Sequence, residues 1–224
     1  MKHSLFVLFI FCTLRLSAQN FSYPKIAIAD QSLDGFIPKN WFLKDSAVGD
    51  LNNDSLSDIA LVIEYKDTIQ ERRPDGEVNR GSPRILAVLL KDAKTGQYKL
   101  FLQNNTFIIR YGEGGMDPEA YGEVSISKGI LKIFVSFLRG NATYKFRMQN
   151  GDLYLIGGST GGVSGGRYYG FDANFNTRRA KVEEGPIDAD ETKVKWVSLP
   201  KAPLKKLREM KMVLRWEVVK DQYL

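Results

Sequence analysis

The sequence predicts an all-β protein in which a four-stranded antiparallel unit packs against an antiparallel β-meander, followed by a short C-terminal helix. Apolar runs rich in β-branched residues, such as residues 59–63 and 84–90, are typical of buried strands. Residues 143–148 alternate between apolar and polar, as strands with one exposed face do. Asn150-Gly151 is a strong signal for a tight hairpin turn.

The first 19 residues are predicted to be an export signal. Lys2 and His3 make a short polar start, residues 5–14 are apolar, and residues 17–19 include small side chains suited to cleavage. The apolar stretch is too short to cross a bilayer as a helix, and no later run is long and apolar enough. We therefore expect a secreted or periplasmic protein with no membrane span.

The chain has one histidine, His3, and one cysteine, Cys12, and both lie in the predicted signal. Without them the protein has no disulfide, none of the usual zinc or copper ligand sets, and no histidine or cysteine catalysis. Carboxylate pairs, a Ser–Lys pair and calcium-assisted chemistry stay open as routes to an enzyme. The net charge of +6 is modest, and the export signal argues against a nucleic-acid partner.

Composition and turn signals divide the chain into five segments. We expect a signal peptide (1–19), a lead-in (20–40), the four-stranded unit (41–105), a Gly-rich β-meander (106–185) and a basic C-terminal segment (186–224). A charged stretch with a Pro-Asp-Gly turn follows the second strand of the four-stranded unit and is predicted to be a long, mobile insertion.

A loop rich in oxygen-bearing side chains joins the first two predicted strands of the four-stranded unit. Asp50, Asn52, Asp54 and Asp58 stand at positions 1, 3, 5 and 9, and Leu56 at position 7 offers its backbone carbonyl. A hard cation such as Ca²⁺ prefers several carboxylate and carbonyl oxygens close together. The loop is therefore predicted to bind calcium, with a metal-free turn rich in Asp and Asn as the alternative.

The segment from Gly49 to Asp54, followed by residues 58–62, resembles the FG-GAP or VCBS repeat, the calcium-bearing blade unit of integrin-α-like β-propellers. The resemblance covers residues 41–103 and implies one propeller-blade-like unit with the five calcium ligands named above. The family usually has glycine where this chain has Ser55, and a left-handed serine costs roughly 1–2 kcal/mol. We therefore expect weak binding, with Kd in the ~10⁻⁴–10⁻³ M range.

The single blade needs a partner surface, because propellers close a ring of several blades and the chain has no second Asp-rich copy. The meander of residues 106–185 is predicted to supply that surface. Within it, residues 144–157 resemble a hairpin of uncharacterised secreted bacterial proteins that also carry an FG-GAP-like unit. That resemblance implies architecture and no activity.

Two glycine-rich segments, residues 111–117 and 157–166, match neither a P-loop nor a dinucleotide-binding turn. They are predicted to be flexible loops at one end of a sheet. If the loops gather, Glu113, Asp117 and Glu119 would line a cleft together with Tyr168 and Tyr169, a combination suited to sugars. In the alternative, the two tyrosines are ordinary strand residues, one facing in and one facing out.

The C-terminal segment carries most of the excess positive charge, in eight basic residues between Lys193 and Arg215. Such a cluster suits an anionic polysaccharide or a membrane surface, and more often is simply a solvated face. Leu204, Leu207 and Met210 recur at intervals of three and predict the short helix. Trp216 is expected to pack in the core.

Together these patterns favour a secreted or periplasmic, calcium-stabilised and non-catalytic binding module. We expect a monomer whose partner is a glycan or an envelope protein. The alternative is a carboxylate-dependent glycan hydrolase with Glu113, Asp117 or Glu119 as acid or base. In such an enzyme the two carboxyl groups lie ~5–5.5 Å apart for retention or ~6.5–9.5 Å apart for inversion.

Overall fold

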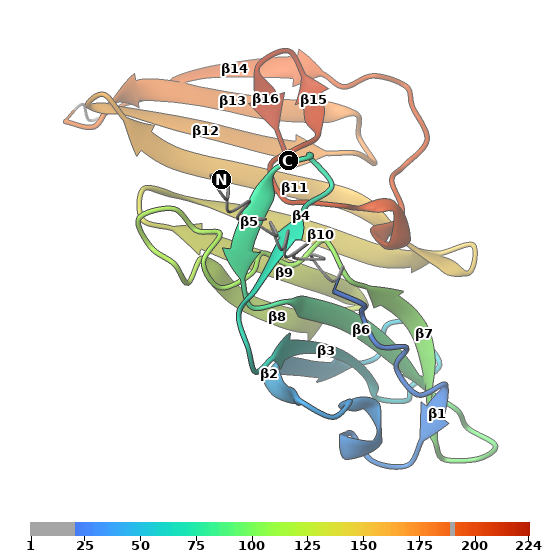
Figure 1. Ribbon diagram of the computed structural model, residues 1–224. Coiled ribbons are helices and arrows are strands. Elements are labelled where there is room, and N and C mark those ends of the chain that lie inside the picture. The colour runs from blue at the N-terminus through green and yellow to red at the C-terminus, as the bar shows by residue number, and fades with distance from the viewer. Residues whose placement is uncertain (1–20, 189–190) are drawn as a thin grey trace, which may run out of the picture.

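The protein is built from two open antiparallel β-sheets, shown by a computed structural model that describes residues 21–188 and 191–224 (Figure 1). The expected all-β class and the antiparallel meander are confirmed. The predicted export signal lies outside the described residues. No helix in the described part of the chain is long and apolar enough to cross a membrane.

The smaller sheet has five strands in the order β1-β7-β6-β3-β2. Its strands are β1 (Ala29–Asp30), β2 (Trp41–Gly49), β3 (Asp58–Tyr65), β6 (Arg84–Lys91) and β7 (Tyr98–Asn104). Two short strands, β4 (Ile69–Arg72) and β5 (Val78–Gly81), form a separate hairpin between β3 and β6. A 3₁₀ turn, η1 (Asp34–Phe36), lies between β1 and β2.

The larger sheet is a seven-stranded meander in which every strand pairs with its neighbours in sequence. Its strands are β8 (Tyr121–Ser127), β9 (Ile130–Phe137), β10 (Gly140–Gln149), β11 (Asp152–Ser164), β12 (Arg167–Asn174), β13 (Arg179–Pro186) and β14 (Lys193–Ser198). A second 3₁₀ turn, η2 (Leu207–Glu209), and a two-stranded hairpin, β15 (Glu217–Val219) and β16 (Gln222–Tyr223), end the chain.

Both faces of the small sheet are covered. Along β3, every residue from Asp58 to Glu64 is buried, because alternate side chains enter two different cores. One face packs against residues of the lead-in, including Ile26 and Phe36. The other face packs against the large sheet. This explains why β3 is continuously apolar rather than alternating.

The large sheet has one covered face and one bare face. Along β10, Tyr144 and Phe146 are fully buried in the main core, whereas Lys145 between them is exposed. The covered face packs against the small sheet and against the C-terminal segment, where Trp216 stacks on Phe175 with ring centroids 5.4 Å apart. Figure 1 shows the C-terminal hairpin and the β4–β5 hairpin lying on this same side of the meander.

The predicted C-terminal helix is wrong: the described residues contain only 3₁₀ turns and no α-helix. The reason is a set of competing long-range hydrogen bonds. The side-chain amide of Asn104 donates to the carbonyls of Leu207 and Met210, and the Leu155 backbone N–H donates to the Lys205 carbonyl. These contacts hold the segment in an extended and 3₁₀ backbone, in which the i→i−4 bonds of an α-helix do not form.

Two expected loops are ordered strands instead. Residues 157–164 belong to β11, the longest strand among the described residues, and only Gly165-Gly166 forms the turn. The predicted mobile insertion is the β4–β5 hairpin, whose turn at Asp75-Gly76 is tied to the C-terminal segment by an ion pair between Asp75 and Arg215 at 2.9 Å.

Candidate functional site

The loop between β2 and β3 is held together by its own acidic side chains. The Asp50 carboxylate accepts backbone hydrogen bonds from Asn53 at 2.7 Å and from Ser55 at 2.8 Å. The Asn52 side-chain amide donates to Asp54 at 2.9 Å, and Asp54 accepts from the Leu56 N–H at 2.8 Å. The predicted ligands therefore lie in one compact turn rather than along a straight segment.

Asp58, the ninth residue of the loop, is fully buried at the start of β3. Its carboxylate accepts hydrogen bonds from the backbone N–H groups of Leu51 at 2.9 Å and Lys91 at 3.0 Å. Burial raises the pKa of Asp58, and the negative charges of Asp54 and Asp50 raise it further. Within residues 21–188 and 191–224, no basic side chain pairs with this carboxylate.

The backbone of the loop has the sharp turn that the sequence predicts. Ser55 adopts φ +68° and Asn53 adopts φ +61°, both in the left-handed region. In the described part of the chain, no three Asp, Glu, His or Cys side chains are gathered closely enough to hold a metal ion. The hard oxygen donors suit calcium by their chemistry, and several of them are occupied by backbone N–H groups. A carboxylate oxygen that accepts a hydrogen bond still has a lone pair that can bind a cation. Calcium binding by this loop therefore stays a prediction.

The carboxylates proposed for a hydrolase are engaged in ion pairs. Glu119 binds the buried Arg84 at 2.6 Å and Lys44 at 2.7 Å, and Glu113 lies 2.7 Å from the buried Arg73. Burial acts to raise the pKa of Glu119, but the hydrogen bonds from Arg84 and Lys44 outweigh it and lower the pKa. Glu119 is thus held as an anion by structural partners, and Glu113 is occupied by its ion pair with Arg73.

The residues of the predicted sugar cleft are not brought together. Glu113 lines a hollow of about 410 Å³ beside the β4–β5 hairpin, and Asp117 accepts a hydrogen bond from the Glu119 N–H. Tyr168 lines a different hollow, on the bare face of the large sheet. Tyr169 is its neighbour on β12 and therefore faces the opposite side of the sheet.

The bare face of the large sheet has a depression that we call the trough. Two adjoining hollows of about 680 and 420 Å³ share Asp172 and Lys181 in their walls. Gly157 and Gly161 of β11 lie in these hollows, and Gly161 pairs with Gly170 of β12. Because glycine has no side chain, these glycine positions form a low floor between the taller side chains of β10 and β13.

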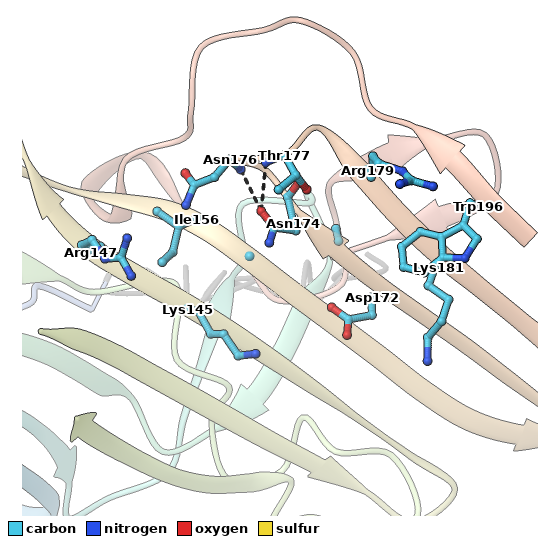
Figure 2. Close-up of a pocket in the computed structure, with 12 residues that line it drawn as sticks. Lys145, Arg147, Ile156, Asp172, Asn174, Asn176, Thr177, Arg179, Lys181 and Trp196 are labelled. Atoms are coloured by element: carbon cyan, nitrogen blue, oxygen red, sulfur yellow. Dashed lines mark hydrogen bonds between the residues drawn. The ribbon is translucent and has the colours of Figure 1, made fainter. Parts of the chain in front are cut away.

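Basic side chains line the walls of the larger hollow (Figure 2). Lys145 and Arg147 come from β10, and Arg179 and Lys181 come from β13. Among the described residues, only Lys181 of these four forms an ion pair, with Glu183 at 3.0 Å. Over the whole trough, five basic side chains face two acidic ones, a net charge of +3. The trough therefore presents a positive potential to solvent.

Two aromatic rings border the trough. The Trp196 side chain on β14 is 57% exposed, and the Arg179 guanidinium lies 4.8 Å from its ring centroid. The Tyr168 ring lies over Gly170, where an added Cβ would meet the tyrosine hydroxyl at 2.7 Å. Both rings are held in place by neighbours on the sheet. They offer flat apolar surfaces beside the charged groups.

The turn between β12 and β13 closes one end of the trough. The Asn174 side chain accepts hydrogen bonds from the backbone N–H groups of Asn176 at 3.0 Å and Thr177 at 3.1 Å, drawn as dashed lines in Figure 2. This is a side-chain-closed turn of the kind that Asn favours. It leaves amide and hydroxyl groups at the rim of the larger hollow.

Sequence reasoning missed the trough, although it contained one clue. The alternation of residues 143–148 marks Lys145 and Arg147 as outward-facing. Their alignment with Arg179, Lys181 and the glycines depends on strand order and register. In the basic C-terminal segment, which sequence reasoning singled out, several of the basic side chains instead form ion pairs within the protein. Arg208 binds Asp152 at 2.8 Å, for example.

Comparison of the chain with protein-family models, with curated proteins and with solved structures finds no match.

Proposed function

We propose that the protein is an exported, non-catalytic binding module that binds an extended glycan in the trough of its large sheet. The observation that carries the proposal is the bare face itself. It combines a glycine floor, exposed basic and amide groups and a half-exposed tryptophan on a rigid sheet. A recognition surface with aromatic anchors and convergent polar groups is typical of binding sites.

The hydrolase alternative receives less support from the geometry. Glu113 and Glu119 are each bound to an arginine that is almost fully buried. An acid that must protonate a glycosidic oxygen needs a raised pKa, whereas the pKa of Glu119 is lowered. Neither Glu113 nor Glu119 lines the trough.

We also propose that β2, β3, β6 and β7 form an FG-GAP-type blade whose loop binds calcium through Asp50, Asn52, Asp54, Asp58 and the Leu56 carbonyl. The buried Asp58 carboxylate, which has no basic partner in the described part of the chain, supports this assignment. A nearby cation would offset its desolvation. Ions that bind only the folded state raise stability by mass action.

Calcium titration tests the loop directly. At a calcium concentration about ten times Kd, the free energy of unfolding should rise by about 1.4 kcal/mol. Asp50→Ala should abolish the rise, whereas Asp67→Ala, an exposed loop aspartate outside the turn, should keep it. A wild type that melts at the same temperature in chelator and in millimolar calcium would remove calcium from the proposal.

Binding to a glycan panel tests the trough. The wild type should bind at least one class of glycan, and Trp196→Ala should weaken that binding without changing the melting temperature, because Trp196 lies at an exposed sheet edge. The control is Tyr223→Ala, which removes another exposed aromatic ring, in the hairpin on the covered side of the sheet. Glycan binding that survives Trp196→Ala unchanged would place the site elsewhere.

A further inference from the structure

We propose that the trough selects an unsulfated uronic-acid glycan, a sugar chain with a carboxylate on some of its rings. This inference rests on the proposed glycan-binding function and adds the chemical class of the ligand. In this arrangement Lys145 and Arg147 on one wall, and Arg179 and Lys181 on the other, bind ligand carboxylates from both sides of the glycine floor.

The charges favour an anionic ligand. Lys145 is exposed on β10, and within the described residues neither it nor Arg147 has an acidic partner. An arginine guanidinium offers paired N–H donors whose geometry matches a carboxylate. Like charges gathered on one face without partners repel one another, and an anion bound between the walls relieves that repulsion.

The acidic groups in the trough limit how densely charged the ligand is. Asp172 lies between the two walls and is exposed, and its carboxylate accepts no hydrogen bond within the described part of the chain. It would repel a nucleic acid or a heavily sulfated chain, which carry anionic groups on every unit. A glycan offers hydroxyl groups that donate to this carboxylate, so a chain with one carboxylate on every second ring fits the mixed lining.

The aromatic rings and the shape of the trough agree with a sugar chain. Trp196 and Tyr168 present apolar ring faces near opposite ends of the trough, where the C–H faces of pyranose rings can pack. Between Ile156 and Val163, β11 extends for roughly 25 Å along the floor. That length accommodates an oligosaccharide of several rings rather than a single sugar.

Titration calorimetry on the full chain tests this specificity. The probe is a hyaluronan oligosaccharide, which carries one carboxylate per disaccharide and no sulfate, and the matched neutral ligand is its carboxyl-reduced form. We expect the reduced form to bind at least tenfold more weakly. Binding of the acidic form should also weaken as salt rises, because surface charges are screened.

Paired variants locate the site. The double variant Lys145→Ser/Arg147→Ser should weaken binding of the acidic probe roughly tenfold or more, since two charge-assisted contacts to ligand carboxylates are lost. The control Lys66→Ser/Lys94→Ser removes two exposed lysines from loops of the small-sheet region and should change Kd less than about twofold. Far-ultraviolet circular dichroism checks that both variants fold.

Tryptophan fluorescence gives an independent readout. Trp41 is only 6% exposed, whereas Trp196 is 57% exposed at the rim of the trough. Trp216, the third tryptophan, stacks on Phe175 on the covered side of the sheet. The acidic probe should therefore change the emission of the wild type and leave that of Trp196→Phe unchanged. This signal separates a ligand that enters the trough from one that binds the basic C-terminal segment.

The outcomes distinguish this inference from the proposed function. Equal binding of the acidic and carboxyl-reduced probes, lost in Trp196→Ala, would keep the glycan module and overturn the uronic-acid specificity. Preference for a sulfated oligosaccharide or single-stranded DNA over the hyaluronan probe would overturn it as well. If no glycan binds, both proposals fail.

Discussion

The two sheets of this protein bury their residues differently. In the small sheet, β3 and β6 are apolar on both faces, and two separate cores cover them. In the large sheet, β10 and β12 alternate, so that one face enters the main core and the other meets solvent. The small sheet thus serves mainly stability, whereas the large sheet has a face left for binding.

The comparison also explains where the charged residues lie. Around the small sheet, buried arginines are neutralised by specific partners, as Arg84 is by Glu64 and Glu119. On the bare face of the large sheet, Lys145 and Arg147 have no such partners among the described residues. Paired charges of the first kind hold elements together, and unpaired charges of the second kind are available to a ligand.

The largest expected effect comes from breaking the ion-pair network that links the sheets. Arg84 lies in β6, is fully buried, and binds Glu119 just before β8 as well as the Ile109 carbonyl. Arg84→Ala should lower the free energy of unfolding by about 3–5 kcal/mol, because it leaves buried acceptors unpaired. Arg80→Ala, at an exposed site, should cost less than about 0.5 kcal/mol. Urea denaturation measures both, and similar losses would contradict the network.

An alanine scan of neighbouring positions tests the two burial patterns. In β3, Leu61→Ala and Val62→Ala should both destabilise, the first by about 2–5 kcal/mol, because each enters a core. In β10, Phe146→Ala should cost about 3–5 kcal/mol and Lys145→Ala less than about 0.5 kcal/mol. Thermal or urea unfolding gives the values. Alternating effects in β3, or uniform effects in β10, would contradict the conclusion that β3 is buried on both faces and β10 on only one.

Two glycines of β11 sharpen the distinction between the faces of the large sheet. A Cβ on Gly158 would meet the Leu224 side chain at 2.7 Å, whereas a Cβ on Gly161 would meet its nearest neighbour at 3.5 Å. Gly158→Ala should destabilise by about 1–3 kcal/mol through overpacking. Gly161→Ala should leave stability nearly unchanged and weaken ligand binding by filling the floor. Equal melting temperatures for the two variants would contradict this assignment of faces.

The smallest expected effect is a pH dependence carried by Glu119. Its folded pKa lies below its usual value, so its stabilising contribution is complete above about pH 4.5 and is lost as the pH falls through the folded pKa. Glu119→Gln should therefore flatten the fall in unfolding free energy below pH 4.5. Glu123→Gln, at an exposed residue that pairs with Lys132, should have the wild-type slope. Identical slopes for all three proteins would show that the pairing does not survive in solution.

Local patterns predicted the strands and turns well. The alternation of residues 143–148 and the Asn150-Gly151 turn both appear in the structure, the turn with φ +47° and +74°. The left-handed Ser55 is also confirmed, and Trp216 is partly buried and packs against the main core. These features depend on steric preferences of one or a few neighbouring residues, which the sequence states directly.

Predictions that depended on partners far along the chain were wrong. Leu204, Leu207 and Met210 have helical spacing, but hydrogen bonds from Asn104 and Leu155 hold this segment in another conformation. The glycines of residues 157–164 suggested a flexible loop, yet pairing with β10 and β12 on both sides makes them a strand. In both cases tertiary contacts outweigh weak local preference.

By itself the sequence determined that the chain forms strands, where many of them turn, and which side chains alternate, because these follow from local sterics and a period of two. Only the tertiary structure decided that one face of the large sheet stays uncovered and that Lys145, Arg179 and Trp196 border one glycine floor. Strand order and register bring these residues together, and a shift of one residue would send each side chain to the opposite face.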